Sequence, residues 1–171
     1  MGLPQRTEAA PFYFTYIDRI TGDNILETMK AQLDDTAAFL GGITEERSLY
    51  RYAPDKWSIR QVVNHVNDTE RVFAFRAMWF ARGFIDPLPS FDQNVASNAA
   101  QADERSLASY SEEFRNIREA TVSLFRNLPA EAWTRSGVAS GNSVTVNALA
   151  YIIAGHVAHH MSILRERYLA S

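Results

Sequence analysis

The chain has 171 residues and a formal net charge of −3, with 17 lysines and arginines against 20 aspartates and glutamates. This balance provides no basic surface of the kind that replaces counterions along a phosphate backbone, so it argues against nucleic-acid binding. Cysteine is absent, which excludes disulfides and thiolate metal ligands. Any thiol chemistry therefore needs a thiol from outside the protein.

The length suits one domain, and we expect a single domain over residues 1–171. Hydrophobic residues make up 46% and charged residues 22%, close to the averages for soluble globular domains. No segment has the apolar length of a signal-peptide core or of a membrane span. We therefore expect a cytoplasmic protein with no membrane partner.

The hydrophobic spacing predicts four helices and very few strands. The first helix covers about residues 24–40, and we expect the glycine pair at 41–42 to end it in a left-handed conformation. The second covers about residues 58–82. It opens on a capping box, in which Ser58 and Gln61 each satisfy a free backbone N–H of the first turn.

The second half of the chain contains two more helices and two connections. A polar connection over residues 84–101 precedes a third helix at about 107–128. Residues 129–141 form the other connection, with one short turn around Trp133, and the fourth helix covers about 143–169. Four amphipathic helices bury their apolar stripes best against one another, which predicts an all-α four-helix bundle with its core over about residues 24–169.

The connection over residues 84–101 is long enough to carry the chain back along the bundle. Short links make sequential helices antiparallel, whereas a crossover of this length leaves them parallel. We expect such a crossover between the second and third helices. A disordered insertion is the alternative.

The four histidines are the candidate functional residues. His156 and His160 lie four residues apart, on one face of the fourth helix and inside its apolar stripe. They can share one ion through metal–nitrogen bonds of about 2.0–2.1 Å, and two unpaired imidazoles would be costly to bury there. His159 lies about 100° round the helix from His160, so we expect it to face solvent or a partner subunit rather than the ion.

The tertiary fold must bring in the third ligand, His65. This residue lies seven positions after Ser58, and His160 lies nine positions before Leu169. At about 1.5 Å per residue, antiparallel packing of the second and fourth helices puts the two histidines at similar heights. The predicted metal ligands are His65, His156 and His160. A hydrogen-bonded His65 without a metal is the alternative.

Two carboxylates lie on the same helix as His65. Glu70 falls within the apolar face of that helix, and a buried carboxylate needs a partner. The partner is either an arginine of another helix, such as Arg118, or the site itself. At the site, Glu70 would accept a histidine N–H or a proton near the metal. Asp68 would orient the His65 ring or face solvent.

Three stretches of the sequence resemble the DinB-like family. They are YAPDKWSIRQVVNHVNDTERVFAFR at residues 52–76, LPSFDQN, and AGHVAHHMSILRERY. The resemblance covers about residues 24–169, and its most specific part is the W-S pair, the histidine seven positions later and the late G-H-x-x-H-H. In that family a histidine of the second helix and an HxxxH pair of the fourth bind a divalent metal. The matching residues here are His65, His156 and His160.

The resemblance also implies a function. The superfamily includes bacterial S-transferases that use bacillithiol or mycothiol, which implies a zinc or nickel ion, a low-molecular-weight thiol and a small-molecule substrate. Three neutral ligands leave such an ion an open position, and its charge stabilises a bound thiolate. The connection over residues 84–101 would shape the pocket. A metal-dependent hydrolase is one alternative, and a non-catalytic metal-binding bundle, acting in stress response or as an interaction module, is the other.

Two further expectations concern assembly and pH. Relatives in the family are commonly homodimers, and Trp79 and Phe80 add aromatic residues of the kind enriched at interfaces. We therefore expect a homodimer. We also expect metal affinity to fall as the ligating imidazoles protonate near pH 6.

Overall fold

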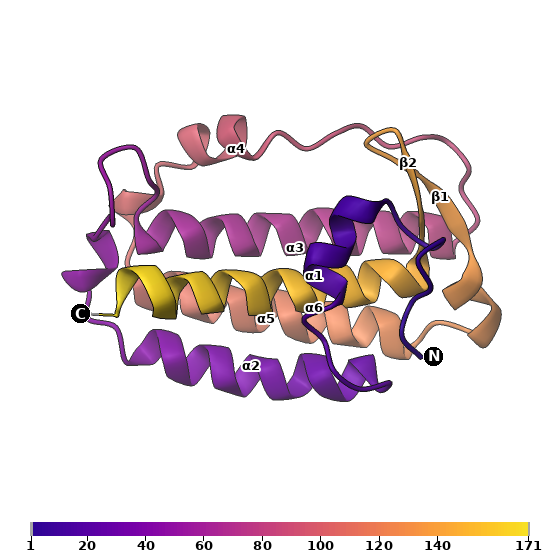
Figure 1. Cartoon of the computed structure of the whole chain (residues 1–171), viewed down its shortest axis with the longest axis horizontal. Coiled ribbons are helices and arrows are strands. Elements are labelled where there is room, and N and C mark those ends of the chain that lie inside the picture. The colour runs from indigo at the N-terminus through magenta and orange to yellow at the C-terminus, as the bar shows by residue number, and fades with distance from the viewer. Residues whose placement is uncertain (1, 171) are drawn as a thin grey trace.

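The computed structural model describes residues 2–170, which form a bundle of four long helices with shorter elements on its surface (Figure 1). The bundle helices are α2 (Ile25–Gly41), α3 (Ile59–Ala81), α5 (Leu107–Arg126) and α6 (Val146–Ile163). The shorter elements are helices α1 (Phe14–Ile17) and α4 (Gln93–Ala100) and strands β1 (Ser136–Ala139) and β2 (Asn142–Thr145). Short 3₁₀ turns lie at Pro11–Tyr13, Arg47–Leu49, Ala102–Glu104 and Ala130–Thr134, and a π-helical turn, Leu164–Tyr168, extends α6.

The helices follow the predicted topology. In Figure 1, α3 and α5 run from left to right, whereas α2 and α6 run from right to left. Helix α3 packs against both α5 and α6, and α2 packs against the same two helices from the other side. The crossover between α3 and α5 and the antiparallel pairing of α3 with α6 are confirmed.

The residues at the helix termini show why α3 begins and α2 ends where they do. Ser58 and Gln61 form the predicted capping box at the start of α3. The glycine pair also ends α2 as expected, but Gly42 has a right-handed φ of −82°. The left-handed cap that we expected there does not form, because the C-cap residue, Gly42, keeps a right-handed backbone conformation.

A β-hairpin, which the sequence did not predict, occupies the connection before α6. Strands β1 and β2 are joined by Ser140 and Gly141, whose φ values of 53° and 76° match a two-residue hairpin turn. Because Asn142–Thr145 belongs to β2, α6 begins at Val146 rather than at the predicted Ser143. The crossover also contains a helix, α4, with Asp92 as its N-cap.

The core lies between the facing stripes of the four long helices. Phe80 belongs to it and packs against Gly137, where an added Cβ would lie 2.1 Å from the Phe80 ring. Our placing of Phe80 at a dimer interface is therefore wrong. Trp79 is partly buried and stacks on Phe84, with ring centroids 4.1 Å apart. In the described part of the chain, no helix combines the length and apolar character that crossing a membrane requires.

Candidate metal centre

Three histidines converge between α3 and α6. The Nε2 atom of His156 lies 3.1 Å from the Nε2 atoms of both His65 and His160. The ligating nitrogens of all three residues lie within 4.8 Å of one another. A shared ion with bonds of about 2.0–2.1 Å would hold its nitrogens about 3 Å apart. Two of the three nitrogen pairs therefore have the spacing that a single ion requires, and the third pair lies within 4.8 Å.

Hydrogen bonding alone does not explain this arrangement. A neutral imidazole nitrogen carries either one proton or one lone pair, so it makes one good hydrogen bond. The His156 nitrogen has two histidine nitrogens at the same distance. A cation at the centre would use the lone pairs of all three rings at once.

Thr69 holds the His65 ring in position. Its Oγ1 lies 3.3 Å from His65 Nδ1, one helical turn along α3. With His65 Nδ1 protonated, this contact leaves the Nε2 lone pair free for an ion, as is usual for ligating histidines. Asp68 instead accepts from Asn64 at 3.0 Å and from Arg71 at 3.5 Å. The orienting role considered for Asp68 therefore belongs to Thr69.

Glu70 is buried, and both of its carboxylate oxygens accept from Arg118, at 2.9 and 2.8 Å. This is the ion pair that one of the two interpretations predicted. Since both oxygens are used in it, the geometry gives no support to Glu70 as a histidine partner or a proton acceptor at the site.

His159 lies beside the group of three but is not part of it. Its ring packs edge-on against Tyr16, with centroids 5.4 Å apart. Its Nδ1 is buried and has no hydrogen-bond partner among residues 2–170. His159 is therefore partly buried against Tyr16 rather than directed fully into solvent, and its expected contact with a partner subunit stays a prediction.

The environment of the three histidines favours their neutral forms. Burial lowers the pKa of His65 to about 4, and burial with the nearby His65 and His159 lowers the pKa of His160 to about 3. Burial, followed by the neighbouring histidines, also lowers the pKa of His156 well below its usual value. Competition between protons and metal should therefore begin below the pH of 6 that we expected from ordinary imidazoles.

These pKa shifts predict an acid-sensitive fold in the metal-free protein. In the unfolded chain a histidine takes up a proton below about pH 6.5, whereas His65 in the folded chain does not until about pH 4. Stability is therefore lost as the pH falls through this interval, by up to about 1.4 kcal/mol per pH unit for each histidine. Urea unfolding at pH 7 and pH 5 measures the loss. A His65→Gln, His160→Gln variant should lose most of this dependence, and an unchanged dependence would contradict the assignment.

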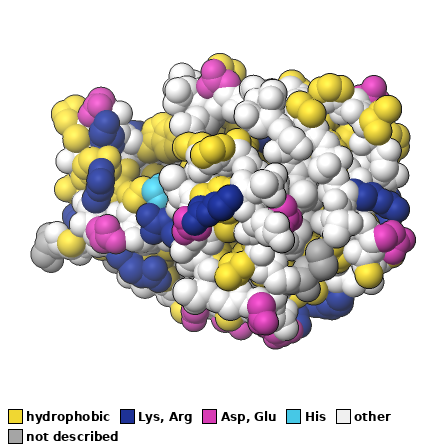
Figure 2. All heavy atoms as spheres, turned by 45° about the vertical axis from the view of Figure 1, so that its right-hand side comes forward, with side chains coloured by type: hydrophobic (Ala, Val, Ile, Leu, Met, Phe, Trp, Pro, Cys, Tyr) yellow, Lys and Arg dark blue, Asp and Glu magenta, His cyan; other side chains and the backbone are white. Residues whose placement is uncertain are grey.

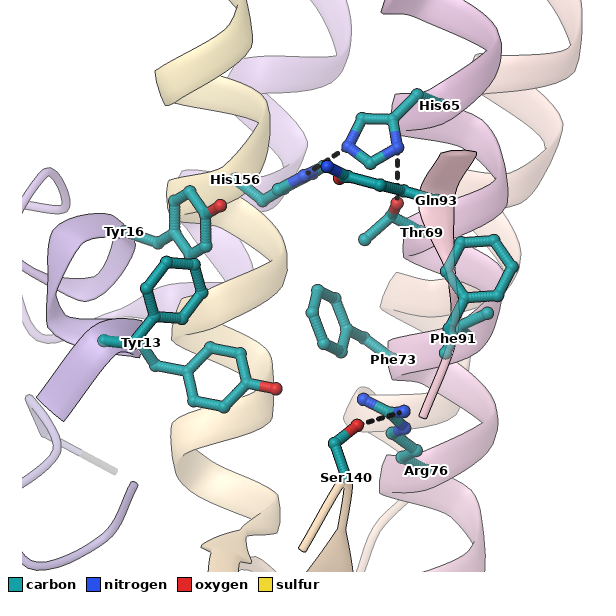
Figure 3. Close-up of a pocket in the computed structure, with 12 residues that line it drawn as sticks. Tyr13, Tyr16, His65, Thr69, Phe73, Arg76, Phe91, Gln93, Ser140 and His156 are labelled. Atoms are coloured by element: carbon teal, nitrogen blue, oxygen red, sulfur yellow. Dashed lines mark hydrogen bonds between the residues drawn. The ribbon is translucent and has the colours of Figure 1, made fainter. Parts of the chain in front are cut away.

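A pocket of about 170 Å³ opens beside His65 and His156 (Figure 3). Its walls come from five parts of the chain that are distant in sequence: the segment around α1, α3, the crossover, the hairpin turn and α6. The lining residues include Tyr13, Tyr16, Phe73, Arg76, Gln93 and Ser140. A second pocket, of about 310 Å³, is lined by His160, and Gln93 lines both pockets. The crossover shapes the site as we expected.

The sequence did not reveal the contribution of α1. This short helix packs on α6, and the Tyr16 carbonyl oxygen lies where an added Cβ on Gly155 would be 2.2 Å away. The absence of a side chain at Gly155 therefore lets α1 approach, and Tyr16 then lies 5.2 Å from His156 between ring centroids. The spacing of Phe14 and Ile17, which are both buried, was the available signal for this helix.

The site is recessed, since His65 and His156 are both buried. Figure 2 shows one histidine side chain in a hollow, flanked by hydrophobic and basic side chains. These features define a class of protein: a four-helix bundle whose three histidines could bind a metal at the floor of open pockets.

Comparison with known proteins identifies the family. The DinB superfamily model matches residues 28–164, and the chain belongs to this superfamily. YfiT from Bacillus subtilis, described as a probable metal-dependent hydrolase with an unusual four-helix bundle topology, is a similar solved structure. Its TM-score is 0.65 at 20% identity, over 95% of this chain and 91% of YfiT.

A second solved structure has the same fold. It is the DinB-like protein YjoA from Bacillus subtilis, with a TM-score of 0.62 at 20% identity, over 86% of this chain and 90% of YjoA. No protein with a curated description matches the sequence. The family match confirms the resemblance seen in the sequence, and these two structures confirm the fold.

Proposed function

We propose that this protein is a metal-dependent enzyme for a small-molecule substrate, and specifically an S-transferase that uses a bacillithiol- or mycothiol-type thiol. The observation that carries the proposal is the convergence of three Nε2 atoms at the floor of open pockets. His65, His156 and His160 would hold a zinc or nickel ion. A fourth protein ligand would favour a structural metal, but the group that could hold an ion consists of three histidines among the described residues.

The lining of the pocket favours a thiol over water. A divalent ion in this position would lower the pKa of a coordinated thiol or water enough to make it nucleophilic at neutral pH. A thiol starts from a pKa near 8.5, and it needs no protein base once coordinated. None of the described residues that line the pocket beside His65 and His156 is a carboxylate. Glu70, the nearest buried one along α3, is held by Arg118.

A metal-dependent hydrolase is the second candidate. It is favoured by the description of YfiT, which shares the fold. In this chain two aromatic side chains would line the reacting position in either reaction. Tyr16 packs against His156, and Phe73 lies 6.2 Å from the same ring between centroids.

A conjugation assay distinguishes the candidates. Zinc- and nickel-loaded protein would be incubated with bacillithiol, mycothiol or glutathione and monochlorobimane, with p-nitrophenyl acetate as a parallel ester substrate. We expect faster conjugation with at least one thiol, its loss in His156→Ala, and its retention in Arg82→Gln, a substitution at the exposed C-cap of α3. Ester hydrolysis without conjugation would support the hydrolase instead. The absence of both activities would contradict both candidate functions.

We also propose that the protein is a homodimer. An aromatic patch of Phe75, Trp79 and Phe84 lies at one end of α3, and Phe75 is 47% exposed. Beside it, an apolar groove of about 480 Å³ runs between α3 and α5. Large exposed apolar surfaces of this kind are typical of interfaces. Light scattering should show a dimer at micromolar concentration and a monomer for Phe75→Glu, whereas a monomeric wild type would reject the proposal.

A further inference from the structure

Arg76 is a buried cation without a counter-charge in the pocket. Its side chain lies on α3, 11 residues after His65, and the residue is only 4% exposed. No carboxylate lies within ion-pairing distance of it in the described part of the chain. The other buried arginine on these helices, Arg118, has Glu70 as its partner. Burying an unpaired charge is costly, so the position of Arg76 needs a reason.

The structural contacts of Arg76 use only part of its guanidinium. One nitrogen, Nη2, donates to the Pro89 carbonyl at 2.9 Å and to Ser140 Oγ at 3.0 Å. These bonds fix the guanidinium between the crossover and the hairpin turn. The other two nitrogens, Nε and Nη1, have no hydrogen-bond partner among residues 2–170. Figure 3 shows the group beside Phe73, at the opposite end of the pocket from His65.

The charge of the pocket points to the chemistry of its occupant. Arg76 is the one charged side chain among the described residues that line the pocket beside His65 and His156. A guanidinium presents its N–H groups in a planar fork that matches the oxygens of a carboxylate or a phosphate. An anionic group of a ligand would supply the counter-charge that the protein does not.

We infer that Arg76 anchors the carboxylate or phosphate of the small molecule that this pocket accepts, while the reactive end of that molecule lies at the three histidines. The inference rests on the proposed function only in taking this pocket as the substrate site. The separation of the two ends would be on the scale of about 16 Å, the rise of the 11 helical residues between His65 and Arg76. Between them the ligand would contact Tyr13 and Phe73, so an apolar or aromatic middle is expected.

Calorimetric binding of three small probes to the purified protein tests this inference. The probes are 3-phenylpropionate, its neutral amide, and 2-phenylethyl phosphate, with metal content measured on every sample. We expect wild type to bind at least one anion about tenfold or more tightly than the amide, the scale of a charged hydrogen-bond pair. The tighter of the two anions shows whether the natural group is a carboxylate or a phosphate.

The variants show whether Arg76 or the metal is the partner of the anion. Arg76→Gln should remove the preference for the anion while metal content stays unchanged, and Arg82→Gln should keep it. Equal binding of acid and amide by wild type would overturn the inference, even if Arg76→Gln fails to fold. A preference that survives in a folded Arg76→Gln would also overturn it, since the metal would then be the anion's partner. If the purified protein contains no metal but still prefers the anion, the result would count against the proposed function and not against the inference about Arg76.

Discussion

Replacing Glu70 with leucine is expected to destabilise the protein by about 3–5 kcal/mol, because Arg118 would remain buried without its counter-charge. The loss of stability should involve all four long helices of the bundle. Arg118 also donates to Gln32 at 3.0 Å, and Gln32 donates to the Ala154 carbonyl at 2.9 Å. One polar network therefore connects α2, α3, α5 and α6. Urea unfolding followed by circular dichroism measures the loss.

Matched variants show whether the loss comes from the ion pair. Glu112→Leu, an exposed substitution on α5, should cost little. Glu70→Leu combined with Arg118→Met removes both charges and should recover most of the stability, as is common for buried pairs replaced by apolar residues. A mild Glu70→Leu variant would contradict the burial of the pair. A folded Glu70→Gln variant with weakened metal binding would indicate that Glu70 contributes to the metal site.

Alanine at any of the three clustered histidines should weaken metal binding by at least about 100-fold. Loss of an outer partner of a metal site typically costs roughly 10–100-fold, and loss of a ligand removes a direct bond. We therefore expect the largest losses for His65→Ala, His156→Ala and His160→Ala. Competition with a chelating dye at pH 7 measures the affinity.

Two neighbouring positions supply the controls for this prediction. His159→Ala changes the adjacent histidine, which is outside the group of three, and should leave the affinity unchanged. Thr69→Val removes the oxygen that holds the His65 ring and should give an intermediate loss. Loss of binding in the His159 variant alone would mean that the wrong member of the adjacent pair was assigned.

The bundle and its histidine group could be predicted because they depend on regular helical spacing. The interval of four between His156 and His160 fixes a shared face, and the capping box at Ser58 fixes where α3 begins. Together with the crossover, these local signals determined the antiparallel pairing that brings His65 to His160. The same periodicity placed Glu70 in the core, where it meets Arg118.

The walls of the pocket could not be predicted in the same way. They come from short elements whose positions depend on tertiary contacts: α1 is held against α6 at Gly155, and the hairpin meets α3 at Gly137 and Ser140. Such segments are too short for a hydrophobic spacing to establish them as helices or strands. The Ser140-Gly141 pair between short alternating runs was the available signal for the hairpin. The sequence did not single out Arg76, because its burial depends on the crossover and the hairpin turn that cover it.

X-ray absorption spectroscopy of the purified protein tests the metal site most directly. We predict about one zinc or nickel ion per chain, with three imidazole nitrogens at about 2.0–2.1 Å and at least one further ligand from solvent or thiol. The His156→Ala, His160→Ala double variant should contain no stoichiometric metal. Equal metal occupancy in wild type and in the double variant, or a coordination shell without imidazole, would contradict the assignment of His65, His156 and His160 as ligands.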